Sequence, residues 1–339
     1  MLYTPTFSDI PQLKKIWQDI FLDSDAFVDW FFTERFDPSL SFCEKTDGKI
    51  ISCLHGYRLP IILSGKEYPA VIIAGVSTLP QYRGMGIAKN LLKEYMKKMY
   101  SIGDIAVAFY TPVNPDIYKF LGHMPFSRAI KAENCRIEKP KEIFDISPLK
   151  LTDLRLYDCY KTYSKSYSGI VARKDYFSVK MRDYSSSQLT CLGALRGEKV
   201  MAYAIYNDKT GKCEECIGDL SALSYIFSTG TFSAMLPPDF PTEKLKGDAK
   251  LVSVSMGGVV NAQLFLKTLS APCPFNFFLN DDIVKENSGV YDFKGNKKKK
   301  PADFSLSSGS LLQLVSGYFV PEKLNSCFEI GNCYTLDLY

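Results

Sequence analysis

A glycine-rich turn in the first third of the chain has the composition of an anion-binding site. Gly84 and Gly86 flank Met85 directly behind Arg83. Glycines at such a turn let the backbone approach a ligand closely. If a helix begins there, its first free N–H groups and the positive end of its dipole favour an anion. A pyrophosphate meets that requirement, and Arg83 would add positive charge beside it.

The neighbouring residues predict the strand and the helix that this turn needs. Residues 70–78 read AVIIAGVST, a run typical of a strand, and residues 104–112 predict a second, buried strand. Asn114 followed by Pro115 predicts the start of a short helix. Apolar residues at helical spacing follow the turn, at Ile87, Ala88, Leu91, Leu92, Tyr95, Met96 and Met99. Residues 81–86 are therefore predicted to join a strand to a helix.

Two common phosphate-binding motifs do not fit the turn. A Rossmann fingerprint needs a third glycine at the position of Lys89, and a P-loop needs Gly-Lys-Ser/Thr, which is absent. The pattern Gln81-x-x-Gly84-x-Gly86-x-Ala88 instead resembles the acetyl-CoA loop of the GNAT superfamily of N-acetyltransferases. That resemblance implies acetyl-CoA as the source of the pyrophosphate.

A second segment at the expected distance strengthens the resemblance. Residues 113–126, VNPDIYKFLGHMPF, are similar to the superfamily's FY-x-x-x-GF segment through Tyr118, Phe120, Gly122 and Phe126. Both motifs occur in order, with the predicted strand of residues 104–112 between them. The alternative for each motif is an unrelated glycine turn or a tyrosine that only packs in the core.

The whole chain resembles the Eis (enhanced intracellular survival) family. The resemblance implies an α/β (α+β) fold of two tandem GNAT-like units, at 1–140 and 141–244, followed by a sterol-carrier-protein-like α/β domain at 245–339. Residues 168–181 resemble the start of the family's second unit, and residues 302–319 resemble its carrier-type helix, although a serine-capped amphipathic helix has the same pattern. The second unit lacks Gln/Arg-x-x-Gly-x-Gly, so we expect it to be degenerate and structural.

The resemblance also implies cofactor contacts. The backbone of Val76, Ser77 and Thr78 would pair with the pantetheine arm, and Val113 and Asn114 would touch the cofactor after the second strand. The pyrophosphate would be held by the turn and the first helical turn, at Arg83, Gly84, Met85, Gly86, Ile87, Ala88 and Lys89.

Two tyrosines are implied to move protons. Tyr118 is the expected general acid, because a phenol with a pKa near 10 stays protonated at neutral pH and can donate to the departing thiolate. In the Eis family the C-terminal carboxylate serves as the base, and Tyr339 would supply it here. A free α-carboxyl has a pKa of about 3.5, so it needs burial, a bridging water or a cation-binding role. A frayed tail is the alternative.

An acidic and aromatic segment, residues 23–36, is a candidate wall of the acceptor pocket. Asp25, Asp29 and Glu34 would attract a polycationic amine, and Trp30 would line the pocket. Ordinary helix surface charge explains the same carboxylates equally well.

The composition excludes several classes of partner. The chain has 339 residues and a net charge of +4, too little to imply nucleic-acid binding. The one basic block, residues 297–300, is interpreted as a solvated hairpin tip. Neither a signal peptide nor an apolar run of about 20 residues is recognisable, so we expect a cytoplasmic protein without a membrane partner.

No metal site is expected from the ten cysteines and two histidines, His55 and His123. Cys213 and Cys216 form the one close cysteine pair, and zinc would need two further ligands. We interpret the pair as part of a turn between strands.

These observations favour an acetyl-CoA-dependent N-acetyltransferase that acts on amines such as aminoglycosides or other polyamine-like small molecules. One alternative acts on protein lysines or N-termini. Another is a non-enzymatic lipid-binding or scaffold protein built on the third unit. The resemblance further implies a homo-oligomer, such as a hexamer.

Overall fold

A computed structural model describes residues 1–21 and 23–337 of the chain. These residues form two compact units. The first combines residues 1–126 with residues 255–331 and Asp337, and the second contains residues 127–254 and 332–336. The chain thus leaves the first unit after Phe126 and returns to it at Ser255. The predicted three-way division of the chain remains a prediction.

A seven-stranded sheet organises the first unit. Its order is β1-β2-β3-β6-β7-β17-β8, with bounds Leu2–Tyr3, Ser41–Thr46, Lys49–Arg58, Ala70–Thr78, Val107–Tyr110, Met256–Val259 and Met124–Pro125. All neighbours are antiparallel except β6 and β7. That parallel pair joins only Ala70, Val71 and Ile72 of β6 to β7. Beyond Ile72, β6 and β7 separate.

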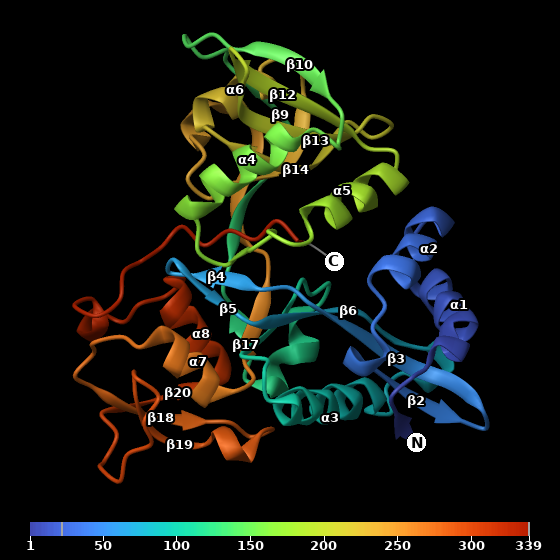
Figure 1. Ribbon diagram of the computed structural model, residues 1–339, viewed down its shortest axis with the longest axis vertical. Coiled ribbons are helices and arrows are strands. Elements are labelled where there is room, and N and C mark those ends of the chain that lie inside the picture. The colour runs from blue at the N-terminus through green and yellow to red at the C-terminus, as the bar shows by residue number, and fades with distance from the viewer. Residues whose placement is uncertain (22, 338–339) are drawn as a thin grey trace. The chain divides into compact units, whose positions relative to one another are not determined.

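Helices cover both faces of this sheet (Figure 1). The helix α3, Ile87–Ile102, packs on the side of β3 that presents Leu54. The helices α1, Ile10–Phe21, and α2, Asp25–Glu34, lie on the opposite side, where Trp17 stacks on His55 of β3. Leu54 and His55 are successive strand residues, so they point to opposite faces. The acceptor candidates of α2 therefore lie across the sheet from α3.

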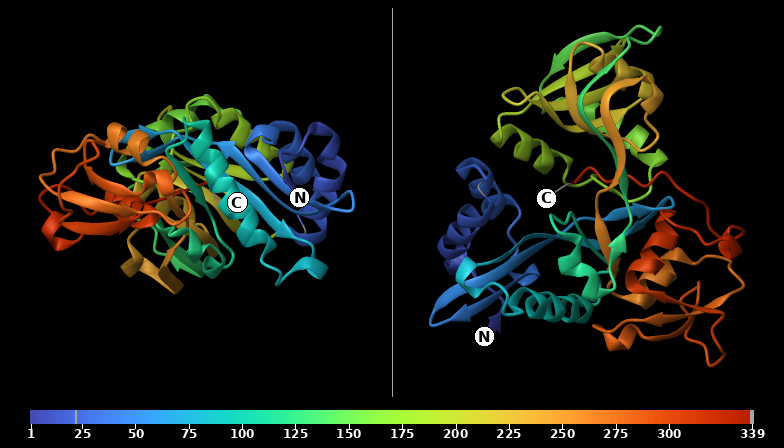
Figure 2. Two further views of the ribbon diagram at one scale, coloured as in Figure 1. Left: turned by 90° about the horizontal axis from the view of Figure 1, so that it is seen from below. Right: turned by 180° about the vertical axis from the view of Figure 1, so that it is seen from behind.

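The later part of the first unit contains a small sheet and two helices (Figure 2). The strands follow the order β19-β18-β20, with bounds Gly289–Asp292, Asn276–Asn280 and Phe304–Ser307. The helices are α7, Ala262–Leu269, and α8, Ser308–Ser316, and α8 packs against β17. A hairpin of β4, Ile61–Leu63, and β5, Lys66–Tyr68, precedes β6. The short 3-10 helices of this unit are η1 Phe7–Asp9, η2 Pro38–Leu40, η3 Pro80–Tyr82, η4 Pro115–Leu121, η7 Lys285–Asn287 and η8 Glu322–Leu324.

The second unit is built on a separate seven-stranded sheet. The order is β10-β12-β13-β14-β15-β9-β16, with bounds Asp145–Leu149, Thr190–Arg196, Lys199–Asn207, Lys212–Gly218, Phe232–Leu236, Arg128–Ile137 and Leu245–Ser253. Its helices and remaining elements are α4 Leu154–Tyr163, η5 Ser164–Ser166, β11 Ile170–Val171, α5 Phe177–Ser186, α6 Leu220–Phe227 and η6 Thr242–Lys244.

A buried charge network stabilises the second unit. Arg173 donates to both carboxylate oxygens of Glu215, at 2.7 and 2.6 Å. The hydroxyls of Tyr184 and Tyr203 donate to the same carboxylate, each at 2.7 Å. A buried ion pair needs such additional hydrogen bonds to offset the cost of desolvation. The network ties the segment before α5 to strand β14.

Most predicted elements appear where expected, and three differ. Residues 50–63 follow the hairpin signal Asp47-Gly48 and predict one strand, but the structure interrupts it between Arg58 and Ile61, where Pro60 has no N–H to donate. Residues 250–256, KLVSVSM, also predict one strand, but β16 ends at Ser253 and β17 begins at Met256 in the other unit. The interpretation of Cys213 and Cys216 as part of a turn is wrong, because both lie within β14.

Candidate active site

The predicted turn has the backbone geometry that only glycine adopts readily. Gly84 and Gly86 have φ angles of +78° and +77°, and Gly86 is the N-cap of α3. Added side chains at these glycines would meet nothing within 4 Å, so the space beside the turn is open. Arg83 donates from Nε to the carbonyl oxygen of Thr78, at 3.1 Å. That bond folds the turn back onto the end of β6.

The N-terminus of α3 is suited to an anion. Gly86 provides no side chain to cap the first turn of the helix, and that turn contains no acidic residue. The N–H groups of Ile87, Ala88 and Lys89 belong to this turn, where a helix has no partner of its own for them. The helix dipole adds positive potential at the same place. A phosphate oxygen can therefore accept from this end of the helix.

In the second unit, a helix that follows a strand has an N-terminus capped by a side chain. Strand β14 leads into α6, whose N-cap is Asp219. The Asp219 carboxylate accepts from the N–H of Ala222 at 3.0 Å. A carboxylate that already occupies a helix N-terminus satisfies the groups that would bind phosphate. This N-terminus lies in the predicted second unit, residues 141–244, whose lack of a cofactor site remains a prediction.

The separation of β6 from β7 leaves backbone available next to the turn. Val76, Ser77 and Thr78 lie beyond Ile72, the last residue of β6 that pairs with β7. On the other edge of β6, Ser77 and Thr78 pair with Cys53 and Ser52 of β3. The edge that faces β7 can therefore pair with an extended ligand. That these residues bind a pantetheine arm remains a prediction.

Tyr118 is held in a buried aromatic cluster. It lies on η4, its side chain is 8% exposed, and its ring stacks on that of Tyr110 with centroids 4.1 Å apart. Burial raises the pKa of Tyr118 to about 12. The phenol is therefore protonated throughout the neutral range, as an acid requires.

The residues around η4 connect it to α3. Asn114 caps η4 by accepting from the N–H of Asp116 at 3.0 Å, whereas Val113 is fully exposed. The Nζ of Lys89 lies 5.2 Å from the centre of the Phe120 ring. This cation–π contact joins the first turn of α3 to the helix that carries Tyr118. The structure thus brings the two predicted motifs together.

The predicted acceptor residues lie on α2 and are largely engaged with neighbours. Asp25 accepts from Gln18 at 2.6 Å, and Asp29 pairs with Lys14 at 2.5 Å. Trp30 is 7% exposed. Glu34 is the last residue of α2. The Asp29 side chain remains 68% exposed, so it can still meet a cation.

The second proton-transfer candidate, Tyr339, lies outside the described residues. The sequence did not single out Tyr110 or His123. The Tyr110 ring stacks on that of Tyr118, and the His123 ring stacks on that of Tyr110. The Nδ1 of His123 and the hydroxyl of Tyr110 are hydrogen-bonded at 3.1 Å. The sequence contains one signal for His123, because it is one of only two histidines and lies inside the second motif.

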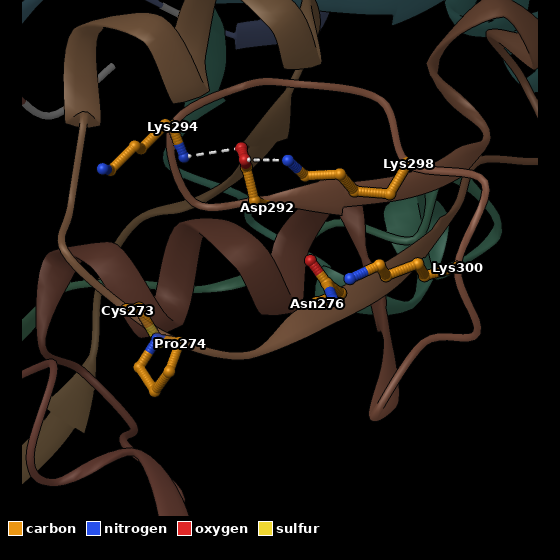
Figure 3. A pocket seen from close by; sticks show the side chains of 7 residues that line it. All are labelled: Cys273, Pro274, Asn276, Asp292, Lys294, Lys298 and Lys300. Atoms are coloured by element: carbon orange, nitrogen blue, oxygen red, sulfur yellow. Dashed lines mark hydrogen bonds and ion pairs between the residues drawn. The ribbon is translucent and has the colours of Figure 1, made fainter.

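A separate open pocket of about 320 Å³ lies at the small sheet of the first unit (Figure 3). Its lining includes Lys294, Lys298 and Lys300, together with Cys273, Pro274, Asn276 and Asp292. The Nζ of Lys298 pairs with Asp292 at 2.8 Å, which neutralises part of this charge. None of the predicted site residues lines this pocket.

The part of the chain that contains the candidate site is similar to a known protein family. Residues 4–126 match the family model of the acetyltransferase (GNAT) domain. These residues form a GNAT acetyltransferase domain. The domain contains the turn, the start of α3 and Tyr118, and it confirms the prediction of an N-acetyltransferase enzyme. No curated protein matches the chain in sequence.

Solved structures extend the likeness to the full chain. A GCN5-related N-acetyltransferase from Anabaena variabilis has a TM-score of 0.81 at 15% identity, with 100% of both chains covered. A probable N-acyltransferase from Enterococcus faecalis has 0.80 at 17%, covering 100% of this chain and 99% of the other. Eis1 from Mycobacterium abscessus has 0.78 at 11%, covering 100% of both. At these identities the likeness establishes the mixed α/β fold alone.

Among the helices of residues 1–21 and 23–337, none combines the length and the apolar character that crossing a membrane requires. Within the same residues, no group of three or more His, Cys, Asp or Glu side chains is placed to hold a metal ion.

Substitution of Gly84 tests the turn directly. Gly84→Val places a β-branched side chain at a left-handed φ and beside the open N-terminus of α3, so we expect the Kd for acetyl-CoA to rise about 10-fold or more. The matched control is Gly103→Val at the other end of the same helix, where φ is +88° and the surroundings are equally open. Calorimetric titration should show a normal Kd for the control. Equal affinities for both variants would contradict the assignment.

Proposed function

We propose that this protein transfers the acetyl group of acetyl-CoA to an amine of a small, polycationic molecule, as a member of the Eis family. The observation that carries the proposal is the open N-terminus of α3, turned by Gly84 and Gly86 beside the unpaired edge of β6. Pyrophosphate at the turn and pantetheine along residues 76–78 would leave the thioester near the separation of β6 and β7. The full-length likeness to Eis1 from Mycobacterium abscessus supports the family at the level of fold.

The proposed reaction is direct transfer. The amine nitrogen, once deprotonated, attacks the thioester carbonyl carbon, and a C–N bond forms. The C–S bond then breaks, and the sulfur keeps the electron pair while Tyr118 donates its phenolic proton to it. The amide product leaves together with CoA in its thiol form. The proton that the amine loses passes to a base.

The pKa of Tyr118 determines how it acts. A phenol with a pKa of about 12 is a weaker acid than the CoA thiol, whose pKa is about 8.5. Complete transfer to a free thiolate is therefore uphill, so donation must accompany cleavage of the C–S bond. Replacement of the proton from solvent then restores the phenol for the next turnover.

Tyr118→Phe removes the proton donor and preserves the ring that stacks on Tyr110. We expect kcat to fall by about 10²–10⁴-fold, the usual contribution of a general acid, while the Kd for acetyl-CoA changes little. Because burial raises the folded-state pKa to about 12, the contribution is present at lower pH and is lost only as pH rises through that value. The ratio of wild-type to variant kcat should therefore stay constant from about pH 6 to about pH 10. A ratio that declines with a midpoint near neutrality would contradict this assignment.

We propose the C-terminal carboxylate of Tyr339 as the base, on the family resemblance alone. Appending a few residues after Tyr339 moves the carboxylate, so turnover should fall by about 10²-fold or more. The same residues placed before Met1 serve as the control and should leave kcat unchanged. Unchanged kcat and KM in the C-terminally extended enzyme would eliminate the carboxylate from the mechanism.

The acceptor class follows from the charges of α2. Asp25 and Asp29 each carry a carboxylate on this helix, and the Asp29 side chain is largely exposed to solvent. We propose that these residues, with Glu34, attract a polycationic amine and that Trp30 supports the pocket wall. We also propose that the protein forms a homo-oligomer, such as a hexamer, and that it is located in the cytoplasm.

A panel of amines tests the acceptor class. Purified protein is incubated with acetyl-CoA and either an aminoglycoside, spermidine, a lysine-containing peptide or a peptide with a free N-terminus, and products are identified by mass spectrometry. We expect acetylated aminoglycoside or polyamine and little acetylated peptide. Acetylation of the peptides alone would replace the small-amine proposal with a protein substrate.

A further inference from the structure

We infer that Tyr110 is a positioning residue that fixes the direction of the Tyr118 phenol, and that His123 holds Tyr110 in place. The inference rests on the proposed function of Tyr118 as the proton donor. Tyr110 lies outside both sequence motifs. His123 lies inside the second motif, at a position that the superfamily pattern does not specify. Neither residue is required to touch acetyl-CoA or the amine.

Tyr118 needs external support because the element that carries it is short and irregular. The helix η4 has seven residues, Pro115–Leu121, and its C-cap is Gly122, whose φ is +69°. The fully exposed Val113 lies two residues before its first residue. Short 3-10 helices have poorer hydrogen-bond geometry than α-helices. The orientation of a side chain on such an element depends on the groups that pack against it.

Tyr110 provides this packing from the sheet. It is the last residue of β7, it is 2% exposed, and its ring lies nearly parallel to that of Tyr118, with an interplanar angle of 29°. The centroids are 4.1 Å apart, close enough for extensive ring contact. Because β7 pairs with β17 along its whole length, Tyr110 is anchored in the sheet by its backbone.

His123 fixes the other end of the Tyr110 side chain. Its Nδ1 is hydrogen-bonded to the Tyr110 hydroxyl at 3.1 Å, and its ring stacks on that of Tyr110 at 5.8 Å between centroids. Burial lowers the pKa of His123 to about 3, so the imidazole is neutral in the working range. A neutral partner adds no charge that would change the ionisation of the neighbouring phenols.

The segment that carries His123 is clamped by the returning part of the chain. Gly309 at the start of α8 donates its N–H to the Gly122 carbonyl at 3.0 Å, and Gln313 donates to the Pro125 carbonyl at 2.6 Å. Gly258 of β17 lies against the His123 ring, since a Cβ there would come within 2.7 Å of Nε2. The order of contacts is thus α8 and β17, then His123, then Tyr110, then Tyr118.

The chemical consequence is alignment of the proton donor. Proton donation to the leaving sulfur requires the phenol within hydrogen-bond reach of that atom as the C–S bond breaks. A misplacement of about 1 Å in such a group can lower the rate by about 10²-fold. The stack and the His123 hydrogen bond restrict that displacement without contacting the reacting atoms.

A double-mutant cycle with acetyl-CoA and neomycin, a polycationic aminoglycoside, tests the inference. The variants are Tyr110→Leu, which removes the stack, Tyr110→Phe, which removes only the hydroxyl, and each of these combined with Tyr118→Phe. We expect Tyr110→Leu to lower kcat by about 10- to 10²-fold with an almost unchanged Kd for acetyl-CoA, and Tyr110→Phe to lower it less. In the Tyr118→Phe background neither change should lower kcat further, because no donor remains to be aligned.

The control is Tyr95→Leu, an equal truncation of a fully buried tyrosine on α3. It should lower the melting temperature and leave kcat near the wild-type value. If Tyr110→Leu does not fold, Tyr110→Phe carries the same cycle.

Three results overturn the inference. The first is an unchanged kcat in the folded Tyr110 variants. The second is an equal fractional loss of kcat in the presence and absence of the Tyr118 hydroxyl. A Tyr118→Phe enzyme with wild-type kcat also overturns it, but that single variant identifies the failure as one of the proposed acid itself.

Discussion

The proposed cofactor site depends on the N-terminus of α3, which has no side-chain cap of its own. Helix α3 begins at Gly86, which has no side-chain oxygen, and two left-handed glycines turn the chain into it. The N-terminus of α6 in the second unit is instead occupied by the Asp219 carboxylate. The free N–H groups at the start of a helix need acceptors. In α6 the protein itself supplies one, whereas in α3 a bound anion can supply them.

The sheet provides the second constraint. Strands β6 and β7 pair only as far as Ile72, and the backbone of β6 beyond that residue is available to an extended ligand. Strand β17, which follows residues 127–254 of the second unit in the sequence, pairs with β7 on its other edge. The returning chain therefore completes the sheet that positions both the cofactor edge and the aromatic cluster around Tyr118.

Local patterns in the sequence predicted the strand and the helix on either side of the glycine turn. Strand β6 has the predicted bounds and α3 begins at the predicted Ile87, because a strand, a glycine turn and helical spacing follow one another without interruption. Tyr110 and His123 could not be predicted in the same way. Their surroundings include β17 and α8, which lie more than a hundred residues later in the sequence. These elements reach Tyr110 and His123 only through the tertiary fold. The division of residues 250–256 between two strands has the same cause, since only the fold determines where the chain crosses between units.

Binding of acetyl-CoA at the start of α3 can be measured by hydrogen exchange of the intact protein with and without acetyl-CoA. We expect acetyl-CoA to slow exchange at the amides of residues 76–78 and 84–90, and to leave exchange at the N-terminal turn of α6 unchanged. Protection confined to other segments, or no protection at the start of α3 under saturating acetyl-CoA, would contradict binding there.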